Sequence, residues 1–243
     1  MKLRRLSGLS VWVSLLLTRS VAAEVPSATP ERPVEEVATK ISEDVYRIGK
    51  AIVDRKKGEV QVEGKVNMQQ GLIELLACTP KGKLHESVLA LDVEPIHLQT
   101  GLLLLDLKFG RNLRFQGDPN TPLGDPVEVW VEWQVDGENY RYRGEDLVFD
   151  RKKGTTMKHT HWVFSGSRIV NGRFAAQEDG SLITTYHDPN TILDNPLETG
   201  GDDETYEANP VVAPPKDTPV RVTIRRVKPP DKRIPIFPDK GVQ

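Results

Sequence analysis

The sequence contains a single cysteine, Cys78, among its 243 residues. One thiol cannot form an intramolecular disulfide, so packing and hydrogen bonds must stabilise the fold even in an exported chain. One thiol also cannot supply the four thiolates that an iron–sulfur cluster usually needs. We therefore expect a substantial hydrophobic core and no iron–sulfur cluster.

The sequence also lacks an excess of charge of either sign. Its 33 Lys and Arg residues nearly balance 35 Asp and Glu residues, which leaves a formal net charge of -2. Such a chain has no overall positive field with which to attract polyanions. The balance therefore argues against nucleic acid as a partner and, by the same reasoning, against acidic phospholipid surfaces.

Familiar catalytic motifs are missing as well. The sequence has no Gly-Xaa-Ser-Xaa-Gly turn, no Walker loop and no His-Glu-Xaa-Xaa-His helix. The segment Phe164-Ser165-Gly166-Ser167 lacks the first glycine of a nucleophile turn, so we interpret it as the end of a strand. These motifs assign no reaction, and the question of enzymatic activity stays open.

Long apolar runs are scarce, and the clearest one lies at the N-terminus. Basic residues at positions 2, 4 and 5 precede an apolar stretch of about twelve residues, and Val21-Ala22-Ala23 follows. This order is typical of a secretory signal peptide over residues 1–23. The stretch is shorter than the roughly twenty residues that span a bilayer. We predict cleavage near Glu24, export to the periplasm or the extracellular medium, and no membrane span afterwards.

Three further segments follow the predicted signal peptide. Residues 24–44 begin with a proline-rich stretch and are predicted as a linker or short helix. Residues 45–227 carry regular apolar patterning with no internal linker, which predicts a single domain. Residues 228–243 contain four prolines and no apolar period. We treat this last segment as a proline-rich tail.

The start of the domain has two interpretations. Apolar residues recur at intervals of three and four over residues 34–48, which fits one helix. In the alternative, a helix ends near Asp44 and a strand begins at Tyr46. We favour the alternative, because residues 47–53 lead into a polar segment that resembles a hairpin turn.

That polar segment, Asp-Arg-Lys-Lys-Gly, occurs twice, at residues 54–58 and at residues 150–154. Each copy follows apolar residues. We expect two hairpin turns in which Asp accepts local backbone hydrogen bonds and Gly takes a positive φ.

Alternation of apolar and polar residues is the strongest pattern in the chain. It is clearest over residues 127–135, and Asp136-Gly137 and Asn171-Gly172 are typical two-residue hairpin turns. Pro95 opens a predicted helix whose body covers residues 97–107. We therefore predict an α+β domain that is mainly β, either an antiparallel sandwich or a partly open barrel, with one or two packed helices.

Six short motifs stand out along the chain, and they are Gly64-Lys65-Val66-Asn67-Met68, Gly71-Leu72-Ile73-Glu74, Gly82-Lys83-Leu84-His85-Glu86-Ser87, Pro95 with residues 102–105, Trp162-Val163-Phe164-Ser165-Gly166-Ser167 and Tyr186-His187-Asp188-Pro189. Together these motifs resemble the YdjY-domain family of bacterial exported proteins. That resemblance covers about residues 45–227 and implies one exported domain of unsettled function. The family is sometimes labelled in connection with iron–sulfur ferredoxins, a label that this chain does not fit because it has one cysteine.

The first candidate site consists of Cys78, His85 and Glu86. If residues 72–78 and 88–93 form a hairpin, the thiol and the imidazole meet near one end, where His could serve as base and Cys as nucleophile. In the alternative, Cys78 is a buried structural residue, and His85 and Glu86 cap or bridge the turn.

The second candidate site is His159-Thr160-His161. On a strand, residues two apart point to the same face, so both imidazoles could ligate one metal ion. A third ligand would come from His187 or Asp188. In the alternative, both histidines are simply solvated at the start of a strand.

The third candidate site is the polar stretch 186–209. Its oxygen-rich side chains suit calcium or another divalent cation, whereas the alternative is an ordered loop held by its own side-chain hydrogen bonds. The residues that support the first interpretation are His187, Asp188, Asn190, Asp194, Asn195, Asp202, Asp203, Glu204 and Asn209.

We therefore expect an exported, soluble, β-rich binding or accessory module whose partner is an unknown protein or small molecule. The competing hypothesis is a metal-dependent enzyme or metal-binding accessory protein that uses His85, Glu86, His187 and Asp188. A redox accessory role through Cys78 is the third hypothesis.

Overall fold

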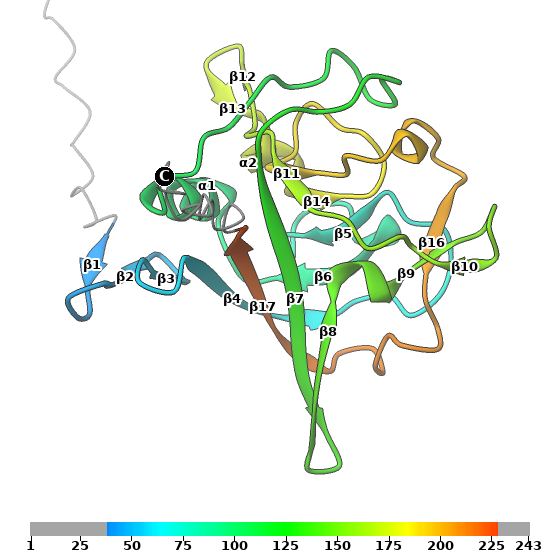
Figure 1. Cartoon of the computed structure of the whole chain (residues 1–243), viewed down its shortest axis with the longest axis horizontal. Helices are drawn as coiled ribbons and strands as arrows, with labels where there is room; N and C mark the ends of the chain where they lie inside the picture. Colours follow the sequence, from blue (N-terminus) through cyan, green and yellow to red (C-terminus); the bar gives the residue numbers. More distant parts are fainter. Residues whose placement is uncertain (1–37, 228–243) are drawn as a thin grey trace, which may run out of the picture. The chain divides into compact units, whose positions relative to one another are not determined.

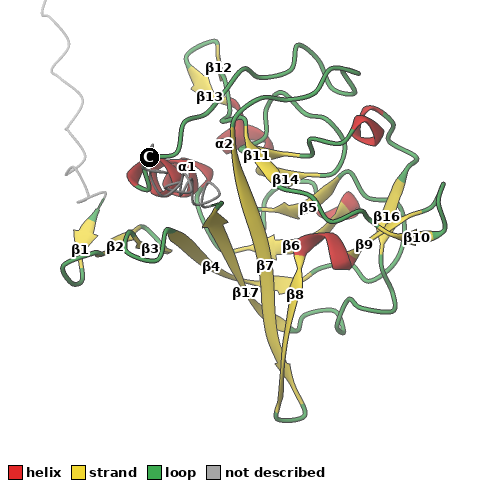
Figure 2. Ribbon diagram, viewed as in Figure 1, coloured by secondary structure: helices red, strands yellow, loops and turns green. Residues whose placement is uncertain are grey.

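The structure is a computed structural model that describes residues 38–227. The predicted signal peptide, most of the 24–44 segment and the 228–243 tail lie outside the described residues. The described elements, drawn in Figures 1 and 2, are β1 (Thr39–Lys40), β2 (Val45–Ile48), β3 (Ala51–Asp54), β4 (Glu59–Val66), β5 (Leu75–Cys78), η1 (Leu84–Glu86), β6 (Ser87–Leu91), α1 (Pro95–Leu104), β7 (Asp125–Val135), β8 (Glu138–Arg143), η2 (Gly144–Leu147), β9 (Val148–Asp150), β10 (Thr155–Thr156), β11 (Trp162–Phe164), β12 (Ile169–Val170), β13 (Arg173–Phe174), α2 (Ala175–Asp179), β14 (Ser181–Thr184), β15 (Leu193–Asp194), η3 (Glu198–Gly201), β16 (Tyr206–Ala208) and β17 (Pro219–Arg226).

Eight strands form a closed barrel. They follow the order β4-β17-β7-β11-β15-β14-β5-β6, and β6 returns to pair with β4. Closure depends on Gly64, which faces Leu91 in register, because a Cβ at position 64 would lie 2.5 Å from the carbonyl oxygen of Ala90. The predicted mainly β fold of class α+β is confirmed, and of the two predicted architectures the chain adopts a barrel, fully closed.

The half of the barrel formed by β4, β17 and β7 is antiparallel and follows the predicted alternation. Val127, Val129 and Val131 are fully buried on the inner face of β7. Strand β17 pairs on one side with β4 and on the other with β7. The predicted hairpin at Asp136-Gly137 joins β7 to β8, which extends the sheet outside the closed ring.

Both Asp-Arg-Lys-Lys-Gly segments are turns, as predicted. Asp54 and Asp150 each accept a hydrogen bond from the backbone N–H three residues later, at 2.9 and 3.0 Å. Gly58 and Gly154 have φ values of +72° and +67°, which a residue with a side chain rarely adopts. The same turn conformation therefore closes two hairpins, β3–β4 and β9–β10.

The helix predicted after Pro95 is confirmed as α1. Leu98 and Leu102 are fully buried and Leu105 nearly so, which matches the predicted apolar side. The helix ends at Leu104, three residues before the predicted end. No helix among residues 38–227 has the length and apolar content needed to cross a membrane.

The start of the domain differs from the single-helix interpretation. Residues 39–40 and 45–48 form strands β1 and β2, and a turn at residues 49–50 divides the predicted strand 47–53 into β2 and β3. The strand predicted after Asn171-Gly172 is also shorter than expected, because α2 begins at Ala175.

The largest difference concerns β5 and β6, which the sequence analysis paired as a hairpin. The two strands pair in parallel, with Leu75 opposite Ser87, and residues 79–86 carry the chain back between them. A second parallel pair joins β14 to β15. The first residues of β5 and β6 therefore lie side by side at one edge, whereas a hairpin would place the first residue of one strand beside the last residue of the other.

Candidate functional site

The parallel pairing of β5 and β6 brings two glutamates together. Paired parallel strands begin at the same edge of a sheet. Glu74 immediately precedes the first residue of β5, and Glu86 immediately precedes the first residue of β6. The backbone N–H of Glu74 donates to the carbonyl oxygen of Glu86 at 3.0 Å. Two carboxylates therefore lie side by side at one end of the barrel, an arrangement that needs a compensating cation.

Lys83 supplies that cation. Its Nζ lies 3.2 Å from Oε2 of Glu74 and 3.1 Å from Oε1 of Glu86. Gln116 donates a further hydrogen bond to Glu74 at 2.7 Å from the loop between α1 and β7. We call Glu74, Lys83 and Glu86 the Lys83 cluster; their side chains are 22%, 31% and 18% exposed.

The Lys83 cluster has perturbed electrostatics. Burial raises the pKa of Glu74; the positive charge of Lys83 opposes this shift and the charge of Glu86 adds to it. Burial alone would lower the pKa of Lys83, but its hydrogen bond to Glu86 and the charges of both glutamates raise it instead. Lys83 is therefore held as a cation between two half-buried carboxyl groups.

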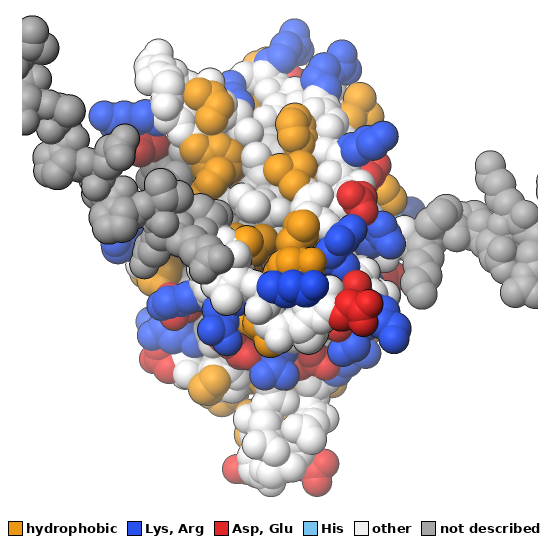
Figure 3. All heavy atoms as spheres, turned by 90° about the vertical axis from the view of Figure 1, so that its left-hand side faces the viewer, with side chains coloured by type: hydrophobic (Ala, Val, Ile, Leu, Met, Phe, Trp, Pro, Cys, Tyr) orange, Lys and Arg blue, Asp and Glu red, His pale blue; other side chains and the backbone are white. Residues whose placement is uncertain are grey.

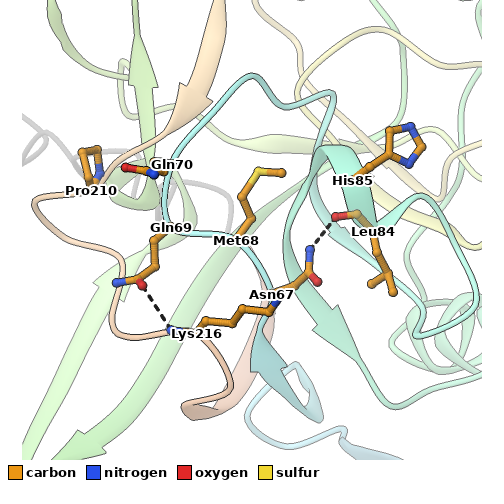
Figure 4. A pocket seen from close by; sticks show the side chains of 8 residues that line it. All are labelled: Asn67, Met68, Gln69, Gln70, Leu84, His85, Pro210 and Lys216. Carbon is orange, nitrogen blue, oxygen red and sulfur yellow. Dashed lines mark hydrogen bonds between the residues drawn. The ribbon is translucent and has the colours of Figure 1, made fainter.

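An open pocket of about 540 Å³ lies beside this cluster. In Figure 4, Met68 stands between Gln69 and Gln70 on one side and Leu84 and His85 on the other. We call this the Met68 pocket; it is lined by Asn67, Met68, Gln69, Gln70, Leu84, His85, Pro210 and Lys216.

Hydrogen bonds fix the walls of the Met68 pocket. The amide nitrogen of Asn67 donates to the carbonyl oxygens of Leu84 and Ser87 at 2.6 and 2.7 Å. Gln69 accepts a hydrogen bond from the backbone N–H of Lys216 at 3.3 Å. The pocket therefore joins three segments, the one after β4, η1 and the one before β17.

The hairpin that would bring Cys78 close to His85 is not formed. Cys78 is fully buried at the C-terminal end of β5, whereas His85 precedes β6 and its side chain is 79% exposed. In a parallel pair these positions lie at opposite ends, so the hairpin geometry required for a nucleophile and its base is not formed. Burial also raises the pKa of the Cys78 thiol, which disfavours the reactive thiolate. Glu86 remains near the imidazole, with Oε2 3.5 Å from Nε2 of His85.

His187 is enclosed by backbone carbonyl groups. Its Nδ1 lies 2.7 Å from the carbonyl oxygen of Asp118, and its Nε2 lies 3.0 and 3.1 Å from those of Asn195 and Leu197. The residue has no exposed surface. Both ring nitrogens are thus engaged with hydrogen-bond acceptors and are turned away from any metal ion.

The other buried polar residues of the 186–209 stretch are also engaged within the protein. Asp188 accepts hydrogen bonds from the backbone of Asn190 at 2.8 Å and from Ser181 at 3.3 Å. Asn195 donates to the carbonyl oxygen of Thr185 at 2.9 Å. Burial raises the pKa of Asp188 and raises that of Asp194 well above its usual range. These contacts match the alternative in which side-chain hydrogen bonds order the loop.

Asp202 and Asp203 lie on the surface after η3. Asp202 pairs with Lys152, and this hydrogen bond lowers the pKa of its carboxyl group. Asp203 is exposed. The pKa of Tyr186 is raised first by the burial of Tyr186 itself and second by the negative charge of Asp203. Among the described residues, neither Asp202 nor Asp203 belongs to a group of three or more side chains that could hold a metal ion.

The histidines at positions 159 and 161 do not form a pair on one strand. Residues 157–161 are a loop, and β11 begins at Trp162. His159 instead lies 2.7 Å from Oδ1 of Asp146. Within residues 38–227 no group of three or more His, Cys, Asp or Glu side chains is arranged to hold a metal ion. The set His85, Glu86, His187 and Asp188 is therefore not assembled.

Glu74, Lys83 and Lys216 were not among the site residues that we predicted from the sequence. Glu74 and Lys83 belong to two of the motifs that resemble the YdjY-domain family, so their positions were marked, but their contact was not. Glutamates precede two apolar runs, at positions 74 and 86. Parallel pairing of those runs would have placed both carboxylates together.

Comparison with known proteins gives a match to a family model. No curated protein and no solved structure matches the chain. The family model described as the YdjY domain matches residues 51–225, which reach from β3 into β17 and include the Lys83 cluster and the Met68 pocket. The chain therefore belongs to the YdjY-domain family.

Proposed function

We propose that this protein is an exported binding or accessory module that holds a carboxylate-bearing ligand in the Met68 pocket. The observation that carries the proposal is the composition of that pocket. Two of its eight lining residues, Lys216 and His85, are basic types, and none is acidic. The volume of about 540 Å³ lies within the range of small-molecule sites.

The side chains of the pocket suit a ligand with one anionic end and a less polar body. An ammonium group such as that of Lys216 forms strong hydrogen bonds with carboxylates. The amides of Gln69 and Gln70 can donate further hydrogen bonds, while Met68, a flexible thioether, can pack against an apolar part of the ligand.

The Lys83 cluster supports this role by positioning η1. Lys83 is engaged with both Glu74 and Glu86 and so is not the group that would bind the ligand. Its contacts tie the start of η1 to the start of β5, and η1 supplies Leu84 and His85 to the pocket. We therefore regard Lys83 as a positioning residue.

Binding without turnover is the form of the proposal that the described residues support best. Cys78 is buried away from His85, and His187 is enclosed by carbonyl groups. The export part of the proposal rests on the signal-peptide pattern at residues 1–23, which lie outside the described residues.

Isothermal titration of the mature chain with succinate, citrate and short peptides that have a free C-terminus tests this function. We expect saturable binding of at least one probe, and about tenfold weaker binding for Lys216→Gln, since one charge-assisted hydrogen bond is lost. Lys81→Gln, which changes an exposed lysine outside the pocket, is the matched control.

Two results would reject the proposal. One is the absence of binding by every carboxylate probe. The other is equal weakening by Lys216→Gln and Lys81→Gln, which would place the bound anion outside the pocket. Conversion of a bound probe into product would replace the binding role with an enzymatic one.

A further inference from the structure

Exposed apolar side chains gather on two neighbouring segments, the 107–124 loop and the β12–β13 hairpin. Large side chains in these segments are left in solvent, with Ile169 65% exposed and Phe109 55% exposed. Figure 3 shows hydrophobic side chains beside Lys and Arg over the upper part of the domain. We call this surface the apical rim; its exposed apolar residues are Phe109, Phe115, Leu123, Ile169 and Val170.

Direct contacts hold the two segments of the apical rim together. Arg168 donates a hydrogen bond to the carbonyl oxygen of Arg114 at 3.4 Å. Phe109 packs edge-on against Phe164, with ring centroids 6.0 Å apart, and closes over Gly166, two residues before the hairpin segment. These contacts place the two segments side by side.

The rim concentrates positive charge although the chain as a whole does not. Residues 108–124 contain three basic residues and one acidic residue, and residues 168–174 contain two basic residues and no acidic one, which gives +2 for each segment. The chain as a whole has a net charge of -2. The basic residues of the rim are Lys108, Arg111, Arg114, Arg168 and Arg173.

Some of this charge is neutralised nearby and some is not. Arg114 pairs with the buried carboxylate of Asp118 at 3.1 Å, and Arg173 pairs with Glu178 at 3.1 Å. Lys108, Arg111 and Arg168, in contrast, form no ion pair with any residue between 38 and 227. Asp125 and Asp179 are the other carboxylates near the rim, and they accept hydrogen bonds from the backbone of Lys108 and the amide of Asn190.

Arginines also line two cavities in the rim. One, of about 350 Å³, is lined by Arg111 and Arg114 together with Asp118. The other, of about 540 Å³, is lined by Arg168 and Arg173 together with Glu178 and Asp179. Guanidinium groups bind phosphate oxygens in a bidentate manner. In each cavity one arginine is already paired, and the other, Arg111 or Arg168, forms no ion pair with the described residues and is the group that can bind a phosphate.

We propose that the apical rim docks onto the surface of a bilayer that contains anionic phospholipids. The apolar tips would enter the boundary between headgroups and acyl chains, and the unpaired cations would contact the phosphates. Apolar residues alone would fit many partners, but cations interleaved with them favour a surface that is both apolar and anionic. A net charge near zero argues against anionic surfaces only if the charges are evenly spread, and in these two segments they are not. The rim shares no lining residue with the Met68 pocket, so this proposal stands apart from the proposed ligand.

Co-sedimentation of the mature chain with lipid vesicles tests the proposal. We expect binding to vesicles of phosphatidylcholine mixed with phosphatidylglycerol, little binding to phosphatidylcholine alone, and loss of binding as salt rises. Arg111→Gln and Arg168→Gln should each weaken binding about fivefold. Ile169→Ser should weaken it as well, because a buried apolar tip is lost.

The matched control is Lys56→Gln with Lys81→Gln, which removes two exposed cations outside the rim. Circular dichroism verifies that each variant is folded. The proposal is overturned if anionic and neutral vesicles bind equally, or if the control weakens binding as much as the rim variants. It is also overturned if the wild-type chain does not bind vesicles but self-associates, and Ile169→Ser abolishes that self-association. The rim would then join two copies of the chain.

Discussion

Two charged clusters, each centred on one basic residue, differ in how far they are open to water. Arg143 donates to Glu145 at 2.9 Å and to the carbonyl oxygen of Thr160 at 2.6 Å, and the Arg143 and Glu145 side chains are 12% and 0% exposed. The Lys83 cluster has similar distances but keeps about a fifth to a third of each side chain in solvent. Similar ion pairs therefore occur almost dry in one place and partly open to water in another.

The difference follows from where each cluster lies in the barrel. Arg143 ends β8 and packs near Trp130, with its guanidinium carbon 5.3 Å from the ring centroid, while η2 folds Glu145 into the protein. The Lys83 cluster lies just before the first residues of β5 and β6, and its side chains are 18% to 31% exposed. An ion pair that is fully buried must stay paired, whereas a half-exposed one can exchange partners with water.

The largest effect that we predict is for Arg143→Leu. This change leaves the Glu145 carboxylate buried without a cation, which should cost about 3–5 kcal/mol in the free energy of unfolding. Urea denaturation measures the loss. Arg141→Leu is the control, because Arg141 lies on the same strand and is 42% exposed; it should cost no more than about 1 kcal/mol. Equal losses for the two variants would remove the distinction between buried and exposed pairs.

A smaller effect is expected for Asp188→Asn, and it depends on pH. Burial raises the pKa of Asp188 in the folded protein. The contribution of the protonated Asp188 to the free energy of unfolding is therefore complete below about pH 4, where the folded and unfolded states are both protonated. This contribution is lost as the pH rises through the folded pKa. The loss amounts to about 1.4 kcal/mol for each unit of the shift.

Asp188→Asn should therefore remove this part of the decline in stability with rising pH. Urea denaturation at a series of pH values measures it, with the exposed Asp203→Asn as the control. If the wild-type and Asp188→Asn curves run parallel, the carboxyl group titrates as it would in the unfolded chain, and our account of its burial is wrong.

The smallest effect on stability is expected for Lys83→Met. Because the Lys83 cluster is partly exposed, the change should cost at most about 1 kcal/mol. Loss of the neighbouring cation should raise the pKa of Glu74 further, which carboxyl-carbon NMR detects as a titration at higher pH. A loss as large as that of Arg143→Leu would mean that the Lys83 cluster is a buried structural pair after all.

The antiparallel strands β4, β17 and β7 could be predicted from the sequence, and the half of the barrel that contains the two parallel pairs could not. Residues 127–135 alternate strictly, and each Asp-Arg-Lys-Lys-Gly turn lies between strands that are neighbours in the sequence. The pairing of Gly64 with Leu91 and of Leu75 with Ser87 joins segments whose relative direction has no local signature. The candidate site lies in this second half, which is why Glu74 and Lys83 were missed.

Burial was the other quantity that residue types did not reveal. His187, Asp188 and Asn195 have the chemistry of ligands, and their number favoured a binding loop. In the structure they order that loop instead, while the more open Met68 pocket contains amides and a thioether that no motif had identified as a site.

An amide NMR map of the mature chain titrated with its tightest carboxylate probe tests the central claim most directly. We predict that the largest shifts fall on residues 67–70, 84–85 and 216, and that residues 143–145 stay unchanged. Shifts centred on His187, on the apical rim or on the Arg143–Glu145 pair, with none in the Met68 pocket, would contradict the account.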